Sequence, residues 1–299
     1  MGYRGIPGIL PRRDNMAIFS NQATLTYNGS STNSNIAYGE ILEVLTATKT
    51  SVEGSYTPGS IVTYAVALRN TGTGPLNGLT VTDDLGGYPF NGTTVYPLTY
   101  EANSAALFVN GVLQAAPAVA PGPPLVISGI NIPGGGDAVL VYQARANAFA
   151  VPSAGGTIIN TATITGDGLS APVTAQETIN AEVTPALTIS KSITPAQVVD
   201  NDRVTYTFVI QNSGNQPVVA TDNAAITDTF DPILTALAVT FDGATWTQGI
   251  GYNYNEATGL FTTVPGQITV PAATYTQDPV TGAYTVTPGI ATLTVTGTI

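Results

Sequence analysis

The sequence contains no cysteine and no histidine, and charged residues fill only 9% of its 299 positions. Without cysteine the chain has no disulfide, no thiol nucleophile and no thiolate ligand for a metal. Without histidine it lacks the usual general base near neutral pH and the commonest metal ligand. These absences argue against an enzyme and against a bound cofactor or metal.

Basic residues are scarce as well, because eight lysines and arginines face nineteen acidic residues, for a net charge of −11. This balance disfavours nucleic acids and anionic membranes as partners. No stretch approaches the roughly 20 apolar residues of a membrane span. We also recognise no secretory signal peptide, since the N-terminus has no apolar run before a small-residue cleavage site.

The residues that are abundant are formers of strands and turns. Threonine, valine, alanine, isoleucine and tyrosine dominate, together with 32 glycines and 21 prolines. This mixture is typical of an all-β sandwich. The length suffices for two domains, each with its own core.

An internal repeat supports that division, because Leu45–Gly72 matches Leu187–Gly214 without a gap. A strand ending in Thr-Asp follows each copy, over Leu79–Leu85 and Ala224–Phe230. Apolar residues alternate with polar ones along both copies, which predicts half-buried strands and no helix. The alternating residues are Val62, Tyr64, Val66 and Leu68 in the first copy, and Val204, Tyr206, Phe208 and Ile210 in the second.

The repeat resembles the tandem conserved repeat domain, of unassigned function, that occurs in many bacterial and archaeal surface proteins. The motifs behind the resemblance are Lys49-Thr50, Val62–Tyr64, Asn70–Gly72, Val81–Asp83, Ile132–Gly134 and Asn160–Thr163, and the second copy carries modified forms of the first four. The resemblance implies two immunoglobulin-like β-sandwiches of about seven strands each. It also implies an extracellular or cell-surface location, and it implies an architecture rather than a chemistry.

The second copy ends before the first one does. We align Ile268–Pro271 with Ile130–Pro133 and Ile290–Gly297 with Asp137–Ala144, because this matches the Ile-x-Val-Pro motif. The strands that close the first copy then have no counterpart in the second. An alternative alignment sets Ile290–Gly297 against Ile159–Gly166 and leaves only the final strand missing.

The missing strands are present at the other end of the chain. Asn21–Gly29, "NQATLTYNG", nearly repeats Asn160–Gly168, "NTATITGDG", and Ser34–Val44 follows it. We therefore predict a flexible basic arm over 1–18, donor strands over 19–44, a first sandwich over 45–185, and a second sandwich over 186–299 that lacks its closing strands.

An unfinished sandwich exposes an open strand edge and an uncovered core, and both invite a strand from another chain. The donor residues that we expect to fill the gap are Ala23, Leu25, Tyr27, Ile36, Tyr38 and Ile41. Such donor-strand complementation joins opposite ends of two copies and builds an open homopolymer. The sequence therefore predicts a structural subunit of an extracellular, pilus-like filament.

Two alternatives remain open at this point. The donor segment can fold back on its own subunit. The protein can also be a monomeric adhesin or carbohydrate-binding module, with ligand contacts in the insertions Tyr88–Pro124 and Asp231–Pro265. A glycan is a candidate partner because Trp246 lies in a tyrosine- and asparagine-rich stretch, although such aromatics usually serve packing.

The only two lysines, Lys49 and Lys191, occupy equivalent positions in the repeat, and the alternation points both inward. Asp83 and Asn160 also fall on inward phases of their strands. A buried lysine, acid and asparagine are what a spontaneous isopeptide bond needs. In the second copy the corresponding residues are Lys191, Asp228 and, from a neighbouring subunit, Asn21. The alternatives are a lysine that reaches water, a plain salt bridge, and turn-capping Asp and Asn residues.

Overall fold

The computed structural model describes residues 16–299, except for the side chains of 16–19 and 40–42. The described chain is all β, with one short 3-10 turn, η1 (Ala220–Asp222), and no α-helix, which confirms the prediction of two tandem β-sandwiches without helices. Among the described residues we find no helix with the length and apolar character to pass through a membrane.

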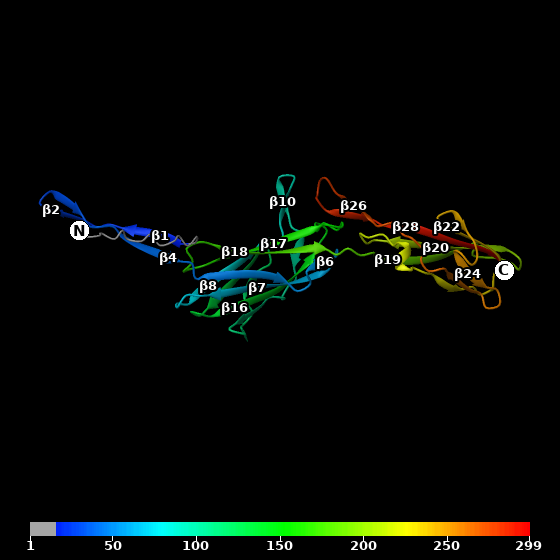
Figure 1. Ribbon diagram of the computed structural model, residues 1–299, viewed down its shortest axis with the longest axis horizontal. Helices are drawn as coiled ribbons and strands as arrows, with labels where there is room; N and C mark the ends of the chain where they lie inside the picture. The colour runs from blue at the N-terminus through cyan, green and yellow to red at the C-terminus, as the bar shows by residue number, and fades with distance from the viewer. Residues whose placement is uncertain (1–15) are drawn as a thin grey trace, which may run out of the picture.

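The first sandwich consists of two sheets that pack face to face (Figure 1). One sheet has the order β13-β12-β16-β7-β5, and β11 also pairs with β16. Its strands are β5 (Leu45–Ser51), β7 (Ile61–Asn70), β11 (Leu98–Tyr100), β12 (Ala106–Val109), β13 (Val112–Leu113) and β16 (Asp137–Ala146). The opposing sheet has the order β14-β15-β8-β17-β18-β6. Its strands are β6 (Ser55–Tyr56), β8 (Leu76–Asp83), β14 (Ala118–Ala120), β15 (Leu125–Ile132), β17 (Thr157–Thr165) and β18 (Val173–Ala181).

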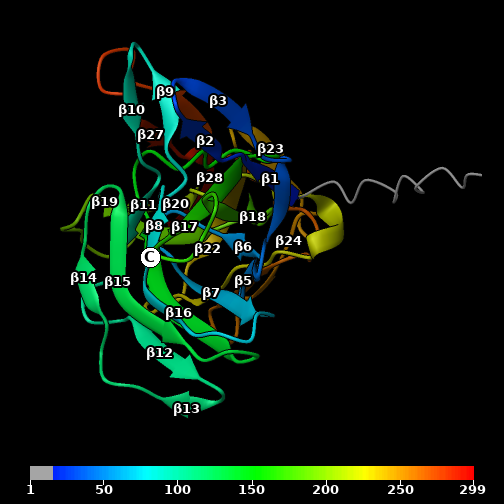
Figure 2. The same cartoon turned by 90° about the vertical axis from the view of Figure 1, so that its left-hand side faces the viewer.

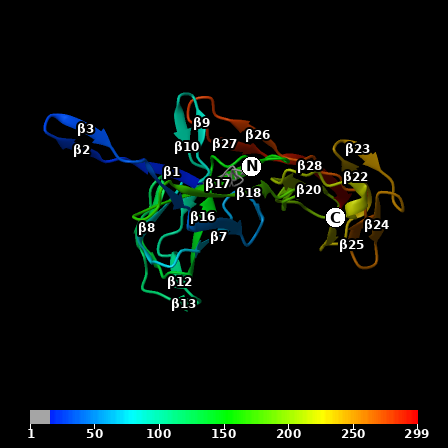
Figure 3. The ribbon, with the colours of Figure 1, turned by 60° about the vertical axis from the view of Figure 1, so that its left-hand side comes forward.

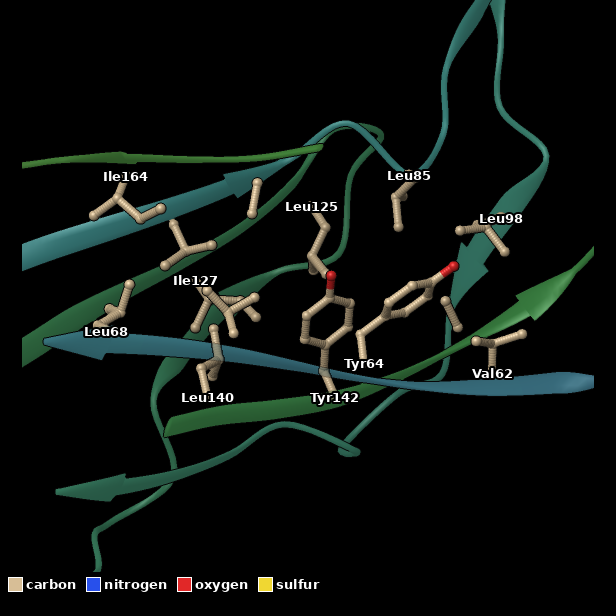
Figure 4. Close-up of a cluster of buried hydrophobic side chains, with 14 of the residues drawn as sticks. Val62, Tyr64, Leu68, Leu85, Leu98, Leu125, Ile127, Leu140, Tyr142 and Ile164 are labelled. Atoms are coloured by element: carbon tan, nitrogen blue, oxygen red, sulfur yellow. The ribbon is translucent and has the colours of Figure 1, made fainter. Parts of the chain in front are cut away.

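The core of the first sandwich follows from the alternation along these strands. Every second residue of β7 is buried, from Val62 to Leu68, and it meets the inward residues of β8, β15 and β16. Figure 4 shows Tyr64 and Tyr142 side by side in this core, and their rings stack with centroids 5.6 Å apart. Period-two burial thus places the two tyrosine rings, with their hydroxyl groups, inside the core.

The second sandwich has its own core cluster, which shares no residue with the first. Its larger sheet has the order β19-β20-β28-β22-β23, and its smaller sheet has the order β21-β25-β24. The strands are β19 (Leu187–Thr194), β20 (Arg203–Asn212), β21 (Thr227–Thr229), β22 (Thr235–Phe241), β23 (Ala244–Trp246), β24 (Tyr252–Asn255), β25 (Leu260–Thr263) and β28 (Gly289–Thr298).

Strand pairing decides between the two alignments of the repeat. Strand β28 pairs antiparallel with β20, as β16 pairs with β7 in the first sandwich, whereas β17 pairs with β8 and β18. The bridge between Val218 and Val270 likewise reproduces the pairing of Leu76 with Ile132. The alignment of Ile290–Gly297 with Asp137–Ala144 is therefore confirmed, and the alternative is wrong.

Within the described residues the second sandwich has no counterpart of β17 or β18. In the first sandwich β8 lies between β15 and β17, but β21 pairs with β25 alone. The expected strand over Ala224–Phe230 is accordingly reduced to the three residues of β21. A strand that loses one neighbour loses half of its ladder of hydrogen bonds, which explains the shortening.

The N-terminal segment forms a two-stranded hairpin. Strand β1 (Met16–Asn21) pairs with β4 (Ala37–Leu42), and β2 (Thr24–Tyr27) pairs with β3 (Ser30–Asn33) around the turn at Asn28-Gly29. We call 16–42 the donor hairpin. It extends away from the first sandwich, at the end opposite the second (Figures 1 and 3). Most of the predicted basic arm, residues 1–15, lies outside the described residues.

A further hairpin of the second sandwich reaches back to the first. It is formed by β26 (Thr274–Gln277) and β27 (Tyr284–Thr287), and it lies beside the hairpin of β9 (Tyr88–Phe90) and β10 (Thr93–Val95) (Figure 2). Asn91 Nδ2 donates to the Pro279 carbonyl at 2.6 Å, and the Tyr284 amide donates to the Ala148 carbonyl at 2.7 Å. These bonds tie the two sandwiches together end to end.

Candidate functional site

A buried lysine lies in the core of the first sandwich. Lys49, on β5, is 4% exposed, and its Nζ donates to Asp83 Oδ2 at 2.5 Å. The amine also lies over the ring of Tyr64, 4.8 Å from the centroid. Burial lowers the pKa of Lys49, while Asp83 acts in the opposite direction. The prediction that Lys49 points inward is thus correct. Because its pKa is lowered, its amine loses a proton more readily than that of an exposed lysine.

Asp83, at the end of β8, is fully buried, and its carboxylate accepts hydrogen bonds from three donors. Its Oδ2 accepts from Lys49 and from the hydroxyl of Tyr142, and its Oδ1 accepts from the Leu85 amide at 2.9 Å. A carboxylate in this position can take a proton from the amine or return one without access to water.

Asn160, on β17, completes the buried set of polar side chains. It is fully buried, and neither Nδ2 nor Oδ1 finds a hydrogen-bond partner within the described residues. The hydroxyl of Tyr64 is also unpartnered. Burial raises the pKa of Tyr64 and of Tyr142. Asn160 lies two residues before Ala162, the strand partner of Asp83, and therefore on the same side of β17. An unsatisfied buried amide is rare and costs about 1–3 kcal/mol.

The structure therefore brings Lys49, Asp83 and Asn160 into one buried cluster, which we call the lysine cluster together with Tyr64 and Tyr142. The strand alternation predicted the first three residues. The alternation also predicted that Tyr64 is a core residue, but it did not single out Tyr142, and nothing in the sequence marked either hydroxyl as part of a site. A neutral amine, a carboxamide and a proton-carrying acid form a set that can make an amide bond.

The second sandwich contains half of the same arrangement. Lys191 Nζ contacts Asp228 Oδ2, and the amine lies 4.6 Å from the ring centroid of Tyr206. The side chain of Lys191 is 38% exposed, however, whereas that of Lys49 is fully covered. Asn21, the third predicted member, lies on the donor hairpin and is exposed. Within one chain its strand β1 lies on the far side of the first sandwich from β19, the strand of Lys191 (Figure 1).

The exposure of Lys191 belongs to a whole uncovered strand face. All eight residues of β19 are exposed, including Leu187, Ile189 and Ile193. In the first sandwich the equivalent Leu45 is 4% exposed, against 44% for Leu187. There β5 lies beside β18, where Glu177 accepts from the amide and hydroxyl of Ser51. We call the exposed side of β19 together with the free edge of β21 the open face.

The donor hairpin is uncovered as well. Every residue from 20 to 38 is exposed, and the predicted donor residues Leu25, Tyr27, Ile36 and Tyr38 stand between 44% and 72% exposed. Ala23 is exposed too, and the side chain of Ile41 lies outside the described residues. The hairpin does not fold back over the second sandwich of its own chain, which argues against that alternative.

Asn70, which belongs to one of the repeat motifs, and its counterpart Asn212 have a structural role that the sequence did not predict. Asn70 and Asn212 are fully buried, and their amides donate to the carbonyls of Pro133 and Pro271. Each side-chain oxygen accepts from the glycine two residues later, Gly72 or Gly214. The Asn-x-Gly turns therefore also link the two sheets. The matching positions of Pro133 and Pro271 in the two copies are the sequence feature that could have indicated this link.

The segments proposed for ligand binding also contribute to the packing and the sheets of the two sandwiches. Trp246 stacks on Phe241 at 4.9 Å between centroids, and it packs against the second core. The insertion Tyr88–Pro124 supplies β11 and β12 to a sheet, and Asp231–Pro265 supplies β22, β24 and β25. Among the described residues no three Asp or Glu side chains gather as a metal site would require.

No protein-family model and no curated protein matches the sequence. Solved structures give weak likenesses. The pilus backbone RrgB of Streptococcus pneumoniae is 12% identical, with 82% of this chain and 56% of that chain covered and a TM-score of 0.31. The major pilin subunit BcpA of Bacillus cereus is 11% identical, with 91% and 73% covered and a TM-score of 0.34.

A family 123 glycoside hydrolase from Clostridium perfringens is 15% identical, with 45% of this chain and 27% of that chain covered and a TM-score of 0.29. The chain spans little more than half the length of RrgB. Likenesses of this strength carry no argument about function.

Proposed function

We propose that this chain is the repeating subunit of an extracellular filament, in which the donor hairpin of one copy completes the second sandwich of the next. The observation that carries the proposal is that the hairpin has the form of the strands that the second sandwich lacks. Asn160 pairs with Glu177 across β17 and β18, and Asn21 pairs with Ala37 across β1 and β4. The chain segments between the two members of each pair have nearly the same length, and each segment doubles back as a hairpin.

The repeat fixes the register of the joint. In the first sandwich Ala162 pairs with Asp83 and Ile164 with Val81. The equivalent residues place Ala23 of the donor opposite Asp228 of the acceptor, and Leu25 opposite Ile226. In this register the inward residues of the hairpin meet the apolar side chains of the open face, and the free edge of β21 gains a complete ladder.

The two exposed surfaces have the right chemistry for each other. Apolar side chains on the hairpin and on β19 are both in water, and their burial releases about 25 cal/mol for each Å² covered. Main-chain hydrogen bonds along β21 add to this, and a buried hairpin of two strands is typical of permanent interfaces. We therefore expect a joint that does not dissociate at ordinary concentrations.

Donor and acceptor lie at opposite ends of an elongated molecule (Figure 1). A contact between two different surfaces adds subunits without closing the assembly unless the rotation forms a ring. An open chain of subunits, two sandwiches each, is the product that this geometry favours. The extracellular location follows from the resemblance of the repeats to surface-protein domains.

Negative-stain imaging of the whole chain tests the proposal, and filaments are the expected result. Deletion of residues 1–44 removes the donor and should leave a monomer with a less stable second sandwich. A synthetic peptide of residues 16–44 should restore the stability of the deleted protein. A monomeric full-length chain whose second sandwich is as stable without residues 1–44 as with them would overturn the proposal and favour an adhesin.

We also propose that Lys49 and Asn160 form an isopeptide bond within each subunit. Nζ of Lys49 attacks Cγ of Asn160, the Cγ–Nδ2 bond breaks, and ammonia leaves while Asp83 carries the protons. The bond removes the unsatisfied primary amide from the core. Intact mass spectrometry should find the subunit about 17 Da below its calculated mass, the mass of one ammonia. An unshifted mass would rule the bond out.

A further inference from the structure

We infer that assembly switches on a second isopeptide bond, between Lys191 of one subunit and Asn21 of the donor hairpin of its neighbour. The inference rests on the proposed function, because only a donated hairpin brings the two residues together. It assigns a covalent role to the half-formed cluster at Lys191 and Asp228, and it makes the filament a continuous covalent chain.

The two lysines occupy matching places in their sandwiches. Lys49 pairs with Val66 across β5 and β7, and Lys191 pairs with Phe208 across β19 and β20. Each amine contacts an aspartate Oδ2 at the end of the equivalent strand, Asp83 or Asp228. Each amine also lies over a tyrosine ring at nearly the same distance, 4.8 Å and 4.6 Å from the centroid.

The second cluster lacks two features of the first. No asparagine from its own sandwich takes the place of Asn160, because β17 has no counterpart there. Its lysine side chain is also partly in water, whereas the side chain of Lys49 is fully covered. Both deficits have one cause, which is the absence of the strands that cover the lysine cluster in the first sandwich.

The donor hairpin supplies both missing features in the proposed register. Asn160 lies two residues before Ala162, the partner of Asp83, and it points to the same side of β17. Asn21 lies two residues before Ala23 in the same way, so it faces the interior beside Asp228 when Ala23 pairs with that residue. The hairpin at the same time covers Lys191 and excludes water from its amine, as the closing strands of the first sandwich do for Lys49.

The reaction is a transamidation that needs no oxidant or further reactant. Nζ of Lys191 attacks Cγ of Asn21, and a proton moves from the amine to Asp228. The Cγ–Nδ2 bond then breaks, Asp228 returns the proton to the departing nitrogen, and ammonia leaves. A new amide joins the two chains. Because the described second sandwich has no strand equivalent to β17 and so no counterpart of Asn160, the reaction waits for the joint to form.

The test compares assembled protein before and after denaturation. Filaments of the whole chain are imaged and then boiled in sodium dodecyl sulfate. We expect a ladder of covalent multimers, and digestion should release a branched peptide that contains Lys191 and Asn21 and lacks one ammonia. The variants Lys191→Arg and Asn21→Ala should still form filaments but should give only monomers after boiling. Asn35→Ala, on the same exposed hairpin but outside the cluster, should keep the ladder.

The outcomes separate this inference from the proposed function. Filaments of the whole chain that fall apart into monomers overturn the cross-link and leave donor-hairpin assembly intact. A ladder that persists in Lys191→Arg also overturns it, because another bond then joins the subunits. A chain that forms no filaments and no multimers overturns both proposals together.

Discussion

At the scale of single residues, the first sandwich has polar side chains where its core should be apolar. The Lys49–Asp83 pair is sealed from water, and Asn160 sits beside it with no hydrogen bond in the described structure. Buried ion pairs contribute little net stability, and an unsatisfied amide detracts from it. A bond between Lys49 and Asn160 would remove both the buried charge of the lysine and the unsatisfied primary amide, and it would turn these two costs into a covalent link.

The variant Asn160→Ala tests the proposed bond between Lys49 and Asn160, because alanine has no carboxamide with which Lys49 could react. The variant should show its full calculated mass, and the first sandwich should melt on the order of 10 °C lower. The cross-link closes a loop of more than 100 residues, which is worth about 4–5 kcal/mol in the unfolded chain. Asn180→Ala, an exposed position on the neighbouring β18, should change neither the mass nor the melting temperature. Equal behaviour of the two variants would contradict the proposal.

The two buried tyrosines should differ in their contribution to stability. Tyr142 donates to the Asp83 carboxylate, whereas the Tyr64 hydroxyl has no partner among the described residues. Tyr142→Phe should therefore cost about 1.5–3 kcal/mol in the unfolding free energy of the first sandwich, and Tyr64→Phe less than about 0.5 kcal/mol. Urea denaturation of the two variants measures this difference. Equal losses would mean that the Tyr64 hydroxyl is bonded after all.

At the scale of strands, the sequence could predict what is local and periodic. The alternation placed Val62, Tyr64 and Lys49 inside, and it put Asp83 and Asn160 on the inward phases of two other strands. Alternation assigns a face to each side chain, but it does not say what covers that face. The exposure of Lys191 and the shortening of β21 depend on a missing neighbour and could be judged only in three dimensions.

Contacts between segments that are far apart in the chain and share no sequence pattern could not be predicted either. The hydrogen bond of Asn70 to the Pro133 carbonyl joins two sheets, and the contact of the β26–β27 hairpin with Asn91 joins residues nearly 190 positions apart. Such contacts depend on how complete sandwiches are placed. No short motif encodes that placement.

The register of the proposed joint gives a prediction about paired strands. Since the chain has no cysteine, Leu25→Cys combined with Ile226→Cys introduces a single candidate disulfide at positions expected to face each other. Oxidised filaments should give disulfide-linked multimers on a non-reducing gel, measured in a Lys191→Arg background that removes the other cross-link. The pair Thr24→Cys with Ile226→Cys, shifted by one residue, places one thiol on the opposite face. If this shifted pair links equally well, the register is wrong.

At the scale of the whole molecule, one chain carries a donor at one end and an acceptor at the other (Figure 1). Each subunit added to a filament therefore leaves one free open face and one free hairpin. At the end with the free open face, growth requires that this face binds the hairpin of the next subunit. Any soluble copy of the hairpin competes for it by mass action.

A peptide of residues 16–44 should accordingly limit filament length when it is present during assembly. It occupies the open face but brings no second sandwich, so growth stops at that end. Mean filament length in electron micrographs should fall as the ratio of peptide to subunit rises. A peptide with Leu25→Asp and Tyr27→Asp keeps the length but places charges where apolar side chains must be buried, and it should leave filament length unchanged. If both peptides shorten the filaments equally, the contact that drives assembly is not the apolar face of the donor hairpin.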